Sequence, residues 1–508
     1  MPANPNTKTS ANESIQALSK LHYVNVGPGG TFKPSGDPAY DSTTADVDKL
    51  FEHLRENDIK NIALYFHGGL TSLKDGLSTA EHFTSLANES KKVHPVSFLW
   101  ETGMMETLKE NLSTIHSNDL FKKLLEKVIK VAGEKLGIDV ESATGRRGVA
   151  SLSNSEINTE LQTEAPFEDY SVDPSARSAT VQNYNEDILK AEIEEELEIE
   201  VELDETLQEE LRKEKSAEEI KFLNTSQLND QQTEGARGIF QTIKLVKSLA
   251  TVVLNVIRRH ISKRDHGFFP TIVEELMREL YVASVGSWIW ASMKKKAASM
   301  WLEDSPGASN PDRHAGSYFM DQLSSYTKDR NDVTIDLIGH SAGSIVICHF
   351  MQRLVNQSYN LPLRNIVFMA PACTSLLFNT SIVANESLFK NFRMFTMEDQ
   401  YEKKDRLVPY VYTRSLLYLV SGALEDEGKS FDAYILGMQR YLDESAPFGN
   451  DPVLSAIRDF FKATENRVIY SKTADDALAG LISTSLKHGD FDNRGEKTME
   501  SIIHILNQ

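Results

Sequence analysis

Cysteine is scarce in this chain, since its 508 residues include only 2, Cys348 and Cys373. Two cysteines exclude the disulfide framework of a small secreted domain and favour a reducing compartment. Both lie in apolar runs, which favours buried thiols over reactive ones. No spacing of histidines, cysteines and carboxylates is typical of a metal site, so the sequence predicts no metal and no other cofactor.

Long hydrophobic runs are absent as well. Residues 1–19 are polar and lack the basic start and apolar run of a signal peptide. The most apolar stretch, residues 239–257, is interrupted by Lys244, Lys247 and Asn255. This pattern is typical of an amphipathic or buried helix rather than a membrane span. We therefore expect a soluble, cytoplasmic protein.

Basic residues are outnumbered by acidic ones. The chain has 54 lysines and arginines against 74 aspartates and glutamates, which gives a net charge of −20. A general nucleic-acid binder needs a basic face for the phosphates, so no nucleic-acid partner is expected. Apolar residues at 40% and charged residues at 25% are typical of a globular protein.

Much of the negative charge is concentrated in one segment. Residues 186–219 include 16 acidic and 4 basic side chains. Within this segment, an alternation of apolar residues with glutamates predicts a strand over 197–203, followed by a charged helix over 207–215. Residues 141–185 are rich in small polar residues and predict a loop or a partly disordered stretch. The acidic segment is either a solvated insertion without chemistry or a surface that binds a protein partner.

Outside that segment, short apolar strands alternate with helical patterns. This order predicts an α/β fold with a mostly parallel sheet and helices on both of its faces. Strands are expected over residues 61–66, 96–100, 333–338, 365–369, 392–397 and 467–471. Helices are expected over residues 239–261, 271–283, 288–301, 344–355, 415–423 and 498–506.

The same order predicts a core that is split by a large insertion. The core comprises residues 20–104 and 315–508. Residues 105–314 form an inserted helical cap, whose acidic and partly flexible segment spans residues 141–219. We expect the cap to lie over the top of the sheet, where the ligand crevices of open α/β sheets are found.

The clearest chemical signal is GHSAG at residues 339–343, between the strand 333–338 and the helix 344–355. This is the G-x-S-x-G pattern in the strand–turn–helix context that it requires. The glycines permit a sharp turn with close backbone contacts, and the turn exposes the hydroxyl of Ser341. The helix that follows favours a developing negative charge at the same place. We expect Ser341 to be a nucleophile.

A second motif, HGGL at residues 67–70, follows the strand 61–66. A loop of this type supplies an N–H group to an oxyanion hole, because small residues let the backbone approach a substrate carbonyl. We assign Gly68 and Gly69 to the hole, together with the N–H of Ala342. His67 is expected to be a structural residue of the loop, and the alternative for the whole motif is an ordinary tight turn.

With these two motifs and a late HG-x-FD segment at residues 488–492, the chain resembles the α/β-hydrolase superfamily on its serine esterase and lipase side. It is similar to a branch of uncharacterised bacterial intracellular hydrolases that carry HGGL, GHSAG and HG-x-FD. The resemblance covers the two core segments and gives no guide to the acidic insertion. It implies that the acid and the histidine of a catalytic triad follow the serine in chain order.

That order leaves two candidates for the general base, because only His488 and His504 follow His349 in the chain. His504 lies among isoleucines in the expected helix 498–506, which favours a packing role. His488 lies in a loop after the last expected strand, where the catalytic histidine of this fold is found. We expect His488 to be the base.

The acid that would orient His488 is left open between two aspartates. Asp405 begins a D-x-x-V-P segment of the kind found in many hydrolases, whereas Asp399 lies closer to the end of the strand 392–397. Either carboxylate would accept a hydrogen bond from Nδ1 of the imidazole, fix its tautomer and stabilise the imidazolium.

Three weaker features each have two interpretations. Residues 27–30, GPGG, lack the lysine and the helix of a phosphate loop and are expected to form a turn. Residues 265–267, DHG, either line a pocket or end a helix, and the helix end is favoured. A group of large apolar side chains either lines an acyl pocket or belongs to the core, and the core is favoured. The group consists of Trp288, Trp290, Met293 and Trp301.

Together, these residues predict a serine hydrolase that cleaves a carboxylic ester of a small molecule or a lipid through an acyl-enzyme. One alternative is a phospholipase or acyltransferase at a membrane surface. The helix 239–261 would then make a peripheral membrane contact through Arg258 and Arg259 near its end. The other alternative is a non-catalytic scaffold of the same fold that binds a protein partner through its acidic insertion.

Overall fold

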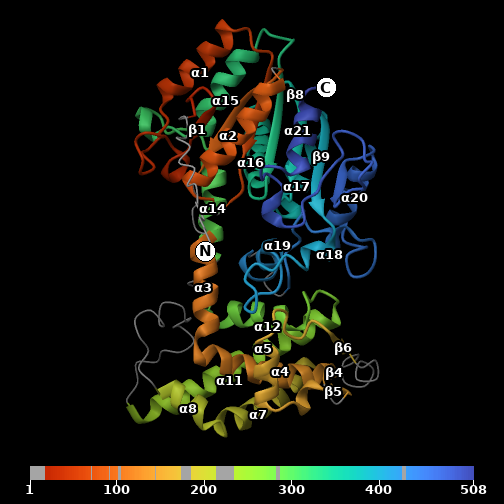
Figure 1. Ribbon diagram of the computed structural model, residues 1–508. Coiled ribbons are helices and arrows are strands. Elements are labelled where there is room, and N and C mark those ends of the chain that lie inside the picture. Colours follow the sequence, from red (N-terminus) through yellow and green to blue (C-terminus); the bar gives the residue numbers. More distant parts are fainter. Residues whose placement is uncertain are drawn as a thin grey trace, which may run out of the picture.

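The structure is a computed structural model, and it describes residues 18–69, 71–90, 92–100, 105–142, 145–172, 185–212, 234–281, 287–425 and 431–508. Figure 1 shows a region built around a sheet in the upper half of the view and a body of helices in the lower half. Residues 18–100 and 287–508 are called the sheet region below, and residues 105–281 are called the helical body.

Seven parallel strands form the main sheet, in the order β1-β3-β2-β7-β8-β9-β10. They are β1 (Tyr23–Asn25), β2 (Asn61–Phe66), β3 (His94–Leu99), β7 (Thr334–His340), β8 (Leu363–Met369), β9 (Phe389–Met397) and β10 (Val468–Ser471). A parallel sheet is covered on both faces, so its strands are nearly continuous apolar runs, as NIALYF in β2 illustrates. The predicted α/β fold with a mostly parallel sheet is confirmed.

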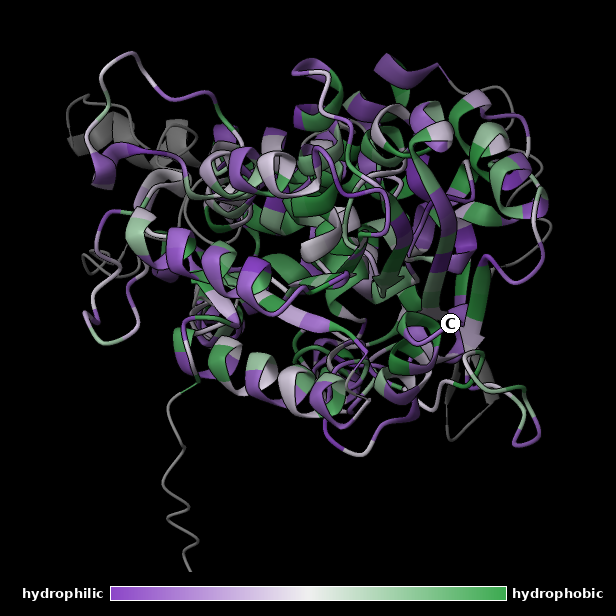
Figure 2. Cartoon of the chain, turned by 90° about the horizontal axis from the view of Figure 1, so that it is seen from above, coloured by the Kyte–Doolittle hydropathy of each residue, from purple (hydrophilic) through white to green (hydrophobic). Residues whose placement is uncertain are grey.

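Alternate residues of the strands enter separate cores on the two faces of the sheet. In β2, Leu64 and Phe66 belong to one apolar cluster, while Ala63 and Tyr65 belong to the other. The first cluster includes residues of α1 (Thr44–Glu56), α14 (Ser287–Ser299), α15 (Ala315–Thr327), α16 (Gly343–Asn356), α17 (Ser375–Ser381) and α20 (Pro452–Lys462). The second includes residues of α2 (Leu73–Ser90) and α21 (Lys497–Leu506). Figure 2 shows apolar residues gathered at the strands and polar residues on the outer helices.

The helical body follows β3 in the chain and lies beyond the carboxyl end of β9 in Figure 1. Its helices are α3 (Met105–Ser117), α4 (Asp119–Leu136), α5 (Asn154–Leu161), α7 (Glu186–Glu202), α8 (Glu205–Arg212), α11 (Glu234–Ile261) and α12 (Phe268–Leu276), followed by the π-helical turn η3 (Met277–Tyr281). A small antiparallel sheet consists of β4 (Ile138–Ser142), β5 (Gly145–Gly148) and β6 (Tyr170–Val172). The long helix α11 packs against α4, α7 and α12 and forms the centre of the body.

Several short elements of the sheet region lie between the sheet and the helical body. After β9 the chain forms α18 (Asp399–Glu402), α19 (Leu416–Leu419), the π-helical turn η6 (Val420–Leu424) and η7 (Gln439–Leu442). In Figure 1, α18 and α19 lie between the sheet and the helical body, and η6 contacts α12. Residues 27–30 form the expected turn, which contains η1 (Pro28–Gly30). Helix α14, although placed in the insertion by the sequence, packs against α16 and η1 of the sheet region.

The strand predicted over 197–203 is wrong, because these residues belong to α7 and the turn after it. The buried residues of α7 recur every four positions, which is the stripe of an amphipathic helix. They are Leu189, Ile193, Leu197 and Val201. The alternation that suggested a strand leaves Ile199 and Leu203 54% and 77% exposed. The surrounding glutamates favour helix, and Glu196 and Glu200 pair with Lys135 (2.9 Å) and Lys127 (2.8 Å) of α4.

The loop or partly disordered stretch predicted over 141–185 is wrong in part, and residues 143–144 and 173–184 of it lie outside the described residues. It contains β5, η2 (Val149–Ser151), α5 and β6. Helix α5 begins with a capping box, in which Ser153 and Glu156 each accept the N–H of the other. Small polar residues therefore mark the ends of short elements here rather than a single loop. None of the helices in the described ranges is both long and apolar enough to cross a membrane.

Candidate active site

Ser341 lies in the turn between β7 and α16. Its φ of 50° is left-handed, a conformation that residues other than glycine adopt rarely and often at functional sites. The N–H of Ser341 donates to the carbonyl of Met369 (2.8 Å), and the N–H of Ala372 donates to the carbonyl of Ser341 (3.0 Å). Both bonds join the turn to β8 or the segment after it, so the strained conformation is held from outside the turn.

The glycines of GHSAG are required by close backbone contacts. A Cβ on Gly339 would lie 2.8 Å from the main-chain carbon of Gly343. A Cβ on Gly343 would overlap the carbonyl oxygen of Phe66 at the end of β2. Since α16 begins at Gly343, its N-terminal dipole favours negative charge beside Ser341.

The imidazole of His488 lies against Ser341. Its Nε2 is 2.8 Å from Oγ of Ser341, although 147 positions separate the two residues in the chain. Both residues are buried, with Ser341 4% and His488 7% exposed. Burial, and then the charge of His340, lower the pKa of His488 to about 3. The imidazole is therefore neutral at neutral pH and able to accept a proton.

Asp405 lies next to His488 but contacts its main chain. Oδ2 of Asp405 accepts the N–H of His488 at 2.7 Å. Nδ1 of His488, the atom that a triad acid would hold, is buried and has no hydrogen-bond partner among the described residues. Burial raises the pKa of Asp405, and the hydrogen bond from His488 opposes this shift. Of the two predicted acids, Asp405 is the one that the structure brings to His488.

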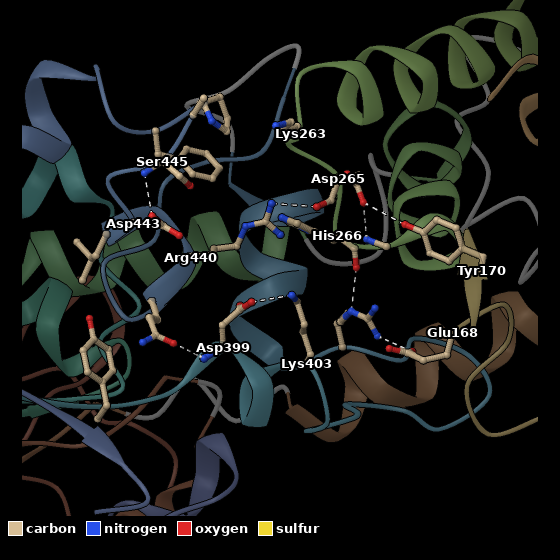
Figure 3. Close-up of a pocket in the computed structure, with 18 residues that line it drawn as sticks. Glu168, Tyr170, Lys263, Asp265, His266, Asp399, Lys403, Arg440, Asp443 and Ser445 are labelled. Atoms are coloured by element: carbon tan, nitrogen blue, oxygen red, sulfur yellow. Dashed lines mark hydrogen bonds and ion pairs between the residues drawn. The ribbon is translucent and has the colours of Figure 1, made fainter. Parts of the chain in front are cut away.

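Asp399 has other partners. Its carboxylate accepts a hydrogen bond from the hydroxyl of Tyr418 (2.6 Å) and forms an ion pair with Lys403 (2.7 Å). Burial alone would raise the pKa of Asp399, but the charge of Lys403 and these bonds lower it. Figure 3 shows Asp399 and Lys403 together on the wall of a cavity. Among the described residues, the hydrogen-bond partners of Asp399 do not include His488.

The cavity in Figure 3 has a volume of about 740 Å³ and lies between the helical body and the sheet region. Residues 265–267 line it from the segment between α11 and α12, and Arg440 faces them from η7. Gly267 is also the N-cap of α12. The favoured interpretation of 265–267 as a helix end is therefore incomplete, because these residues also line a pocket. Neither Ser341 nor His488 lines this cavity.

The loop after β2 brings Gly68 and Gly69 to the serine. A Cβ on Gly68 would lie 3.5 Å from Cβ of Ser341, and a Cβ on Gly69 would lie 2.8 Å from Cβ of Ala342. Within the described part of the chain, the N–H groups of Gly69 and Ala342 donate no hydrogen bond, so both are available to an oxyanion. Leu70, the last residue of HGGL, lies outside the described residues.

His67 is a structural residue of this loop, as predicted. Its Nε2 accepts the N–H of Trp100 (3.1 Å), so Nδ1 carries the proton and donates to the carbonyl of Gly68 (2.7 Å). The indole N–H of Trp100 in turn donates to the carbonyl of His67 (3.2 Å). Burial lowers the pKa of His67 to about 4. A neutral His67 thus fixes the path of the two glycines.

The large apolar side chains after residue 287 divide between three environments. Trp301 is buried against the rings of Phe66 and Phe98, and Trp290 is buried with its indole N–H donating to Glu425 (2.8 Å). The core assignment holds for these two and for Met293, which is buried in the same apolar cluster. Trp288 is 61% exposed and therefore belongs to neither a pocket nor the core. Met293 contacts the candidate oxyanion loop, since a Cβ on Gly69 would overlap its sulfur.

Two residues beside the serine were not assigned a role from the sequence, although both stand in the quoted motifs. His340 is the second residue of GHSAG, and Asp492 is the last residue of HG-x-FD. Nδ1 of His340 lies 2.9 Å from Oδ2 of Asp492, which also accepts the hydroxyl of Tyr65 at 2.9 Å. The presence of an acid and a histidine inside two separate motifs was the signal that could have suggested a contact.

Two predicted contacts are not supported. His504 is exposed on α21 and hydrogen-bonds Gln508, so its expected packing role is wrong. Arg259 is fully buried and forms ion pairs with Glu274 (2.7 Å) and Glu275 (3.0 Å), so it is not available to a lipid surface. Arg258, the neighbouring arginine, forms an ion pair with Glu186 of α7.

Glu402, at the end of α18, is a buried acid close to both predicted aspartates. It is 1% exposed, and Oε1 accepts the hydroxyl of Ser415 at 2.6 Å. Burial raises the pKa of Glu402 to about 8; the bond from Ser415 opposes this shift, and the charges of Asp405 and Asp399 add to it. The group is therefore mostly protonated at neutral pH, which limits the negative charge around His488.

This raised pKa predicts a pH-dependent stability. The folded chain binds the proton of Glu402 more tightly than the unfolded chain, whose value is 4.5. The stabilising contribution is full below that value and is lost as pH rises through about 8. Glu402→Gln has no such proton to lose. Between about pH 5 and about pH 9, its free energy of unfolding is therefore expected to rise by a few kcal/mol relative to that of wild type.

Urea unfolding at the two pH values measures this difference. Glu465→Gln, at an exposed glutamate, is the matched control and is expected to follow wild type. A Glu402→Gln protein whose stability falls with pH as steeply as that of wild type would contradict the protonation of Glu402.

Comparison with protein-family models, with curated proteins and with solved structures returns no match. Among the residues that the structure describes, no group of three or more histidines, cysteines and carboxylates is placed to hold a metal ion. The function must therefore be argued from the site itself.

Proposed function

We propose that this protein is a serine hydrolase of the α/β-hydrolase type that cleaves a carboxylic ester through an acyl-enzyme. The observation that carries the proposal is the 2.8 Å contact between Oγ of Ser341 and Nε2 of His488. The left-handed turn at Ser341, the HGG loop and the parallel sheet support it. In this proposal the helical body is the cap over the carboxyl edge of the sheet.

The reaction follows from the donors and acceptors around the serine. Oγ of Ser341 attacks the ester carbonyl while Nε2 of His488 takes its proton. The N–H groups of Gly69 and Ala342 stabilise the oxyanion, each by about 3 kcal/mol, and Gly68 lets the loop approach the substrate. The proton on His488 then passes to the leaving alcohol. Water, deprotonated by the same imidazole, attacks the acyl-enzyme and releases the acid.

Asp405 is the acid of this proposal. Its carboxylate accepts the main-chain N–H of His488. Nδ1 of His488 has no partner among the described residues. The imidazolium formed during the reaction therefore needs an anion near Nδ1, and Asp405 is the neighbouring carboxylate. Asp405→Asn is expected to lower kcat by about 10²- to 10⁴-fold. Asp399→Asn is the matched control and is expected to change kcat by less than about 3-fold, because its partners are Tyr418 and Lys403. A larger loss of kcat in Asp399→Asn than in Asp405→Asn would instead assign the role of the acid to Asp399.

Labelling with a fluorophosphonate probe tests the proposed function directly. An activated serine reacts with the probe, and mass spectrometry is expected to find the adduct on Ser341. A panel of p-nitrophenyl esters of increasing chain length and a panel of phospholipid vesicles then define the substrate. An unlabelled wild-type protein would support the non-catalytic scaffold instead, and turnover of vesicles alone would support a phospholipase.

A further inference from the structure

The imidazole of His340, the residue before Ser341, has a hydrogen-bond acceptor at each nitrogen. Nδ1 lies 2.9 Å from Oδ2 of Asp492, and Nε2 lies 3.1 Å from the main-chain carbonyl oxygen of His488. A carbonyl oxygen can only accept a hydrogen bond, so Nε2 carries a proton. Whether Nδ1 also carries a proton then depends on whether the carboxyl group of Asp492 is ionised.

The surroundings of Asp492 favour the ionised carboxylate. Oδ2 of Asp492 accepts a hydrogen bond from the hydroxyl of Tyr65, and it also lies 2.9 Å from Nδ1 of His340. Burial alone would raise the pKa of Asp492, but the charge of His340 and the bonds from His340 and Tyr65 lower it. Burial alone would lower the pKa of His340, but the charge and hydrogen bond of Asp492 and the carbonyl of His488 raise it. An ionised carboxylate accepts only, so Nδ1 of His340 carries a proton too.

We propose that His340 is an imidazolium paired with Asp492, which positions His488 through its main-chain carbonyl and opposes a second charge on the neighbouring imidazole. The consequence for catalysis rests on the proposed function, whereas the charge of His340 does not. The ring centroids of His340 and His488 are 5.6 Å apart, so a cation on the first opposes a second cation on the other. His340 is thus a positioning residue, and it joins the GHSAG and HG-x-FD motifs.

The main chain of His488 is held from two sides. His340 donates to its carbonyl, and its N–H donates to Asp405 at 2.7 Å. These two bonds fix the segment that directs Nε2 toward Ser341, without using either nitrogen of the His488 ring. The charged pair therefore orients the base while leaving its imidazole free for proton transfer.

Other titratable groups surround the pair, and His82 of α2 interacts electrostatically with Asp492. His67 faces His340 from the loop after β2 and is neutral, because burial lowers its pKa to about 4. Tyr65 of β2 remains protonated, because burial and then Asp492 raise its pKa. Asp405 faces His488 and interacts electrostatically with Lys487, Asp490 and Lys109. His67 interacts in the same way with Lys296 of α14. Within the described residues, Asp492 is the anion that contacts the His340 ring.

Nuclear magnetic resonance of ¹⁵N-histidine-labelled protein at about pH 8 tests the charge without requiring turnover. The signals of His340 are identified by their loss in His340→Gln. Two protonated ring nitrogens are expected in wild type, and one is expected in Asp492→Asn, in which the counter-ion is removed. A single protonated nitrogen in wild type, or an unchanged His340 in Asp492→Asn, would overturn the proposal.

The pH profile of kcat/KM for p-nitrophenyl acetate tests the effect on His488. His340→Gln keeps an N–H donor for the carbonyl but removes the positive charge, so His488 binds a proton more readily. The acid limb of the profile is expected to move toward neutral pH by about one to two units. The control His504→Gln, at an exposed histidine, is expected to leave the limb in place. An acid limb that does not move in a folded His340→Gln protein would overturn the role of the cation.

The two measurements separate this inference from the proposed function. A wild-type protein that hydrolyses no ester and takes up no fluorophosphonate would refute the hydrolase, and the resonance experiment would still decide the charge of His340. Conversely, an active enzyme with a neutral His340 would keep the proposed function and refute the inference.

Discussion

Ser341→Ala is expected to lower kcat for ester hydrolysis by about 10⁴- to 10⁶-fold and to abolish fluorophosphonate labelling. In the proposed reaction the hydroxyl is the attacking atom, and Nε2 of His488 lies 2.8 Å from it. Loss of the nucleophile leaves the loop donors of Gly69 and Ala342 intact, so substrate binding persists while turnover stops. Initial rates with p-nitrophenyl acetate measure the change, and a variant with more than a tenth of wild-type kcat would refute the nucleophile.

The left-handed φ of Ser341 adds a stability test at the same position. Glycine adopts this conformation without steric cost, whereas alanine does not. Ser341→Gly is therefore expected to be as inactive as Ser341→Ala but more stable than it by about 0.5–1 kcal/mol. Ser358, an exposed serine with a φ of 54°, is the matched control, since Ser358→Gly should gain a similar amount over Ser358→Ala and keep full activity. Equal stability of the two Ser341 variants would mean that the turn is not strained.

Local patterns predicted the elements that carry the site. The apolar run of residues 61–66 is β2 at the same bounds, because a strand buried on both faces is specified by its own composition. The strand–turn–helix around residues 339–343 is likewise present, since its glycines are demanded by backbone contacts at 2.8 Å or closer. Patterns of this kind are readable because the physical requirement lies within a few residues of chain.

The strand predicted at 197–203 failed for a related reason. Over seven residues, alternating apolar side chains and glutamates satisfy a period of two, but the buried stripe of α7 becomes visible only when residues 189–201 are taken together. Which face of α7 is buried is decided by its packing against α11 and α4 rather than by its neighbours in sequence. A short window cannot separate the two periods.

The pairing of Ser341 with His488 was implied by the resemblance of the motifs, but the contacts of Asp405 and His340 could not be predicted, for a different reason. Asp399 and Asp405 stand on the same segment, and only the three-dimensional path of the chain after α18 brings one of them to the N–H of His488. The contact of His340 with Asp492 spans 152 positions. Contacts over such distances follow from the packing of elements, and no local pattern specifies them.

A buried ion-pair network within the helical body is joined to the sheet region by a hydrogen bond from Tyr412, and its loss has the second large expected effect. Arg259 of α11 is 0% exposed and pairs with Glu274 (2.7 Å) and Glu275 (3.0 Å) of α12. Glu274 also accepts from His266 (2.8 Å) and from the hydroxyl of Tyr412 (2.5 Å) in the sheet region. Burial alone would raise the pKa of Glu274, but the charges of His266 and Arg259 lower it to about 2.

Arg259→Met is expected to lower the unfolding free energy by about 3–5 kcal/mol, because it leaves two buried carboxylates with one cation fewer. Arg258→Met is the matched control on the same helix. That arginine pairs with a half-exposed Glu186, so its loss should amount to less than about 1 kcal/mol. Urea unfolding of the three proteins measures both values. Since Tyr412 ties this network to the sheet region, Arg259→Met should also loosen the helical body from the sheet and advance its proteolysis. Equal stability of the two variants would show that the carboxylates take up protons without loss and that apolar packing alone holds the body in place.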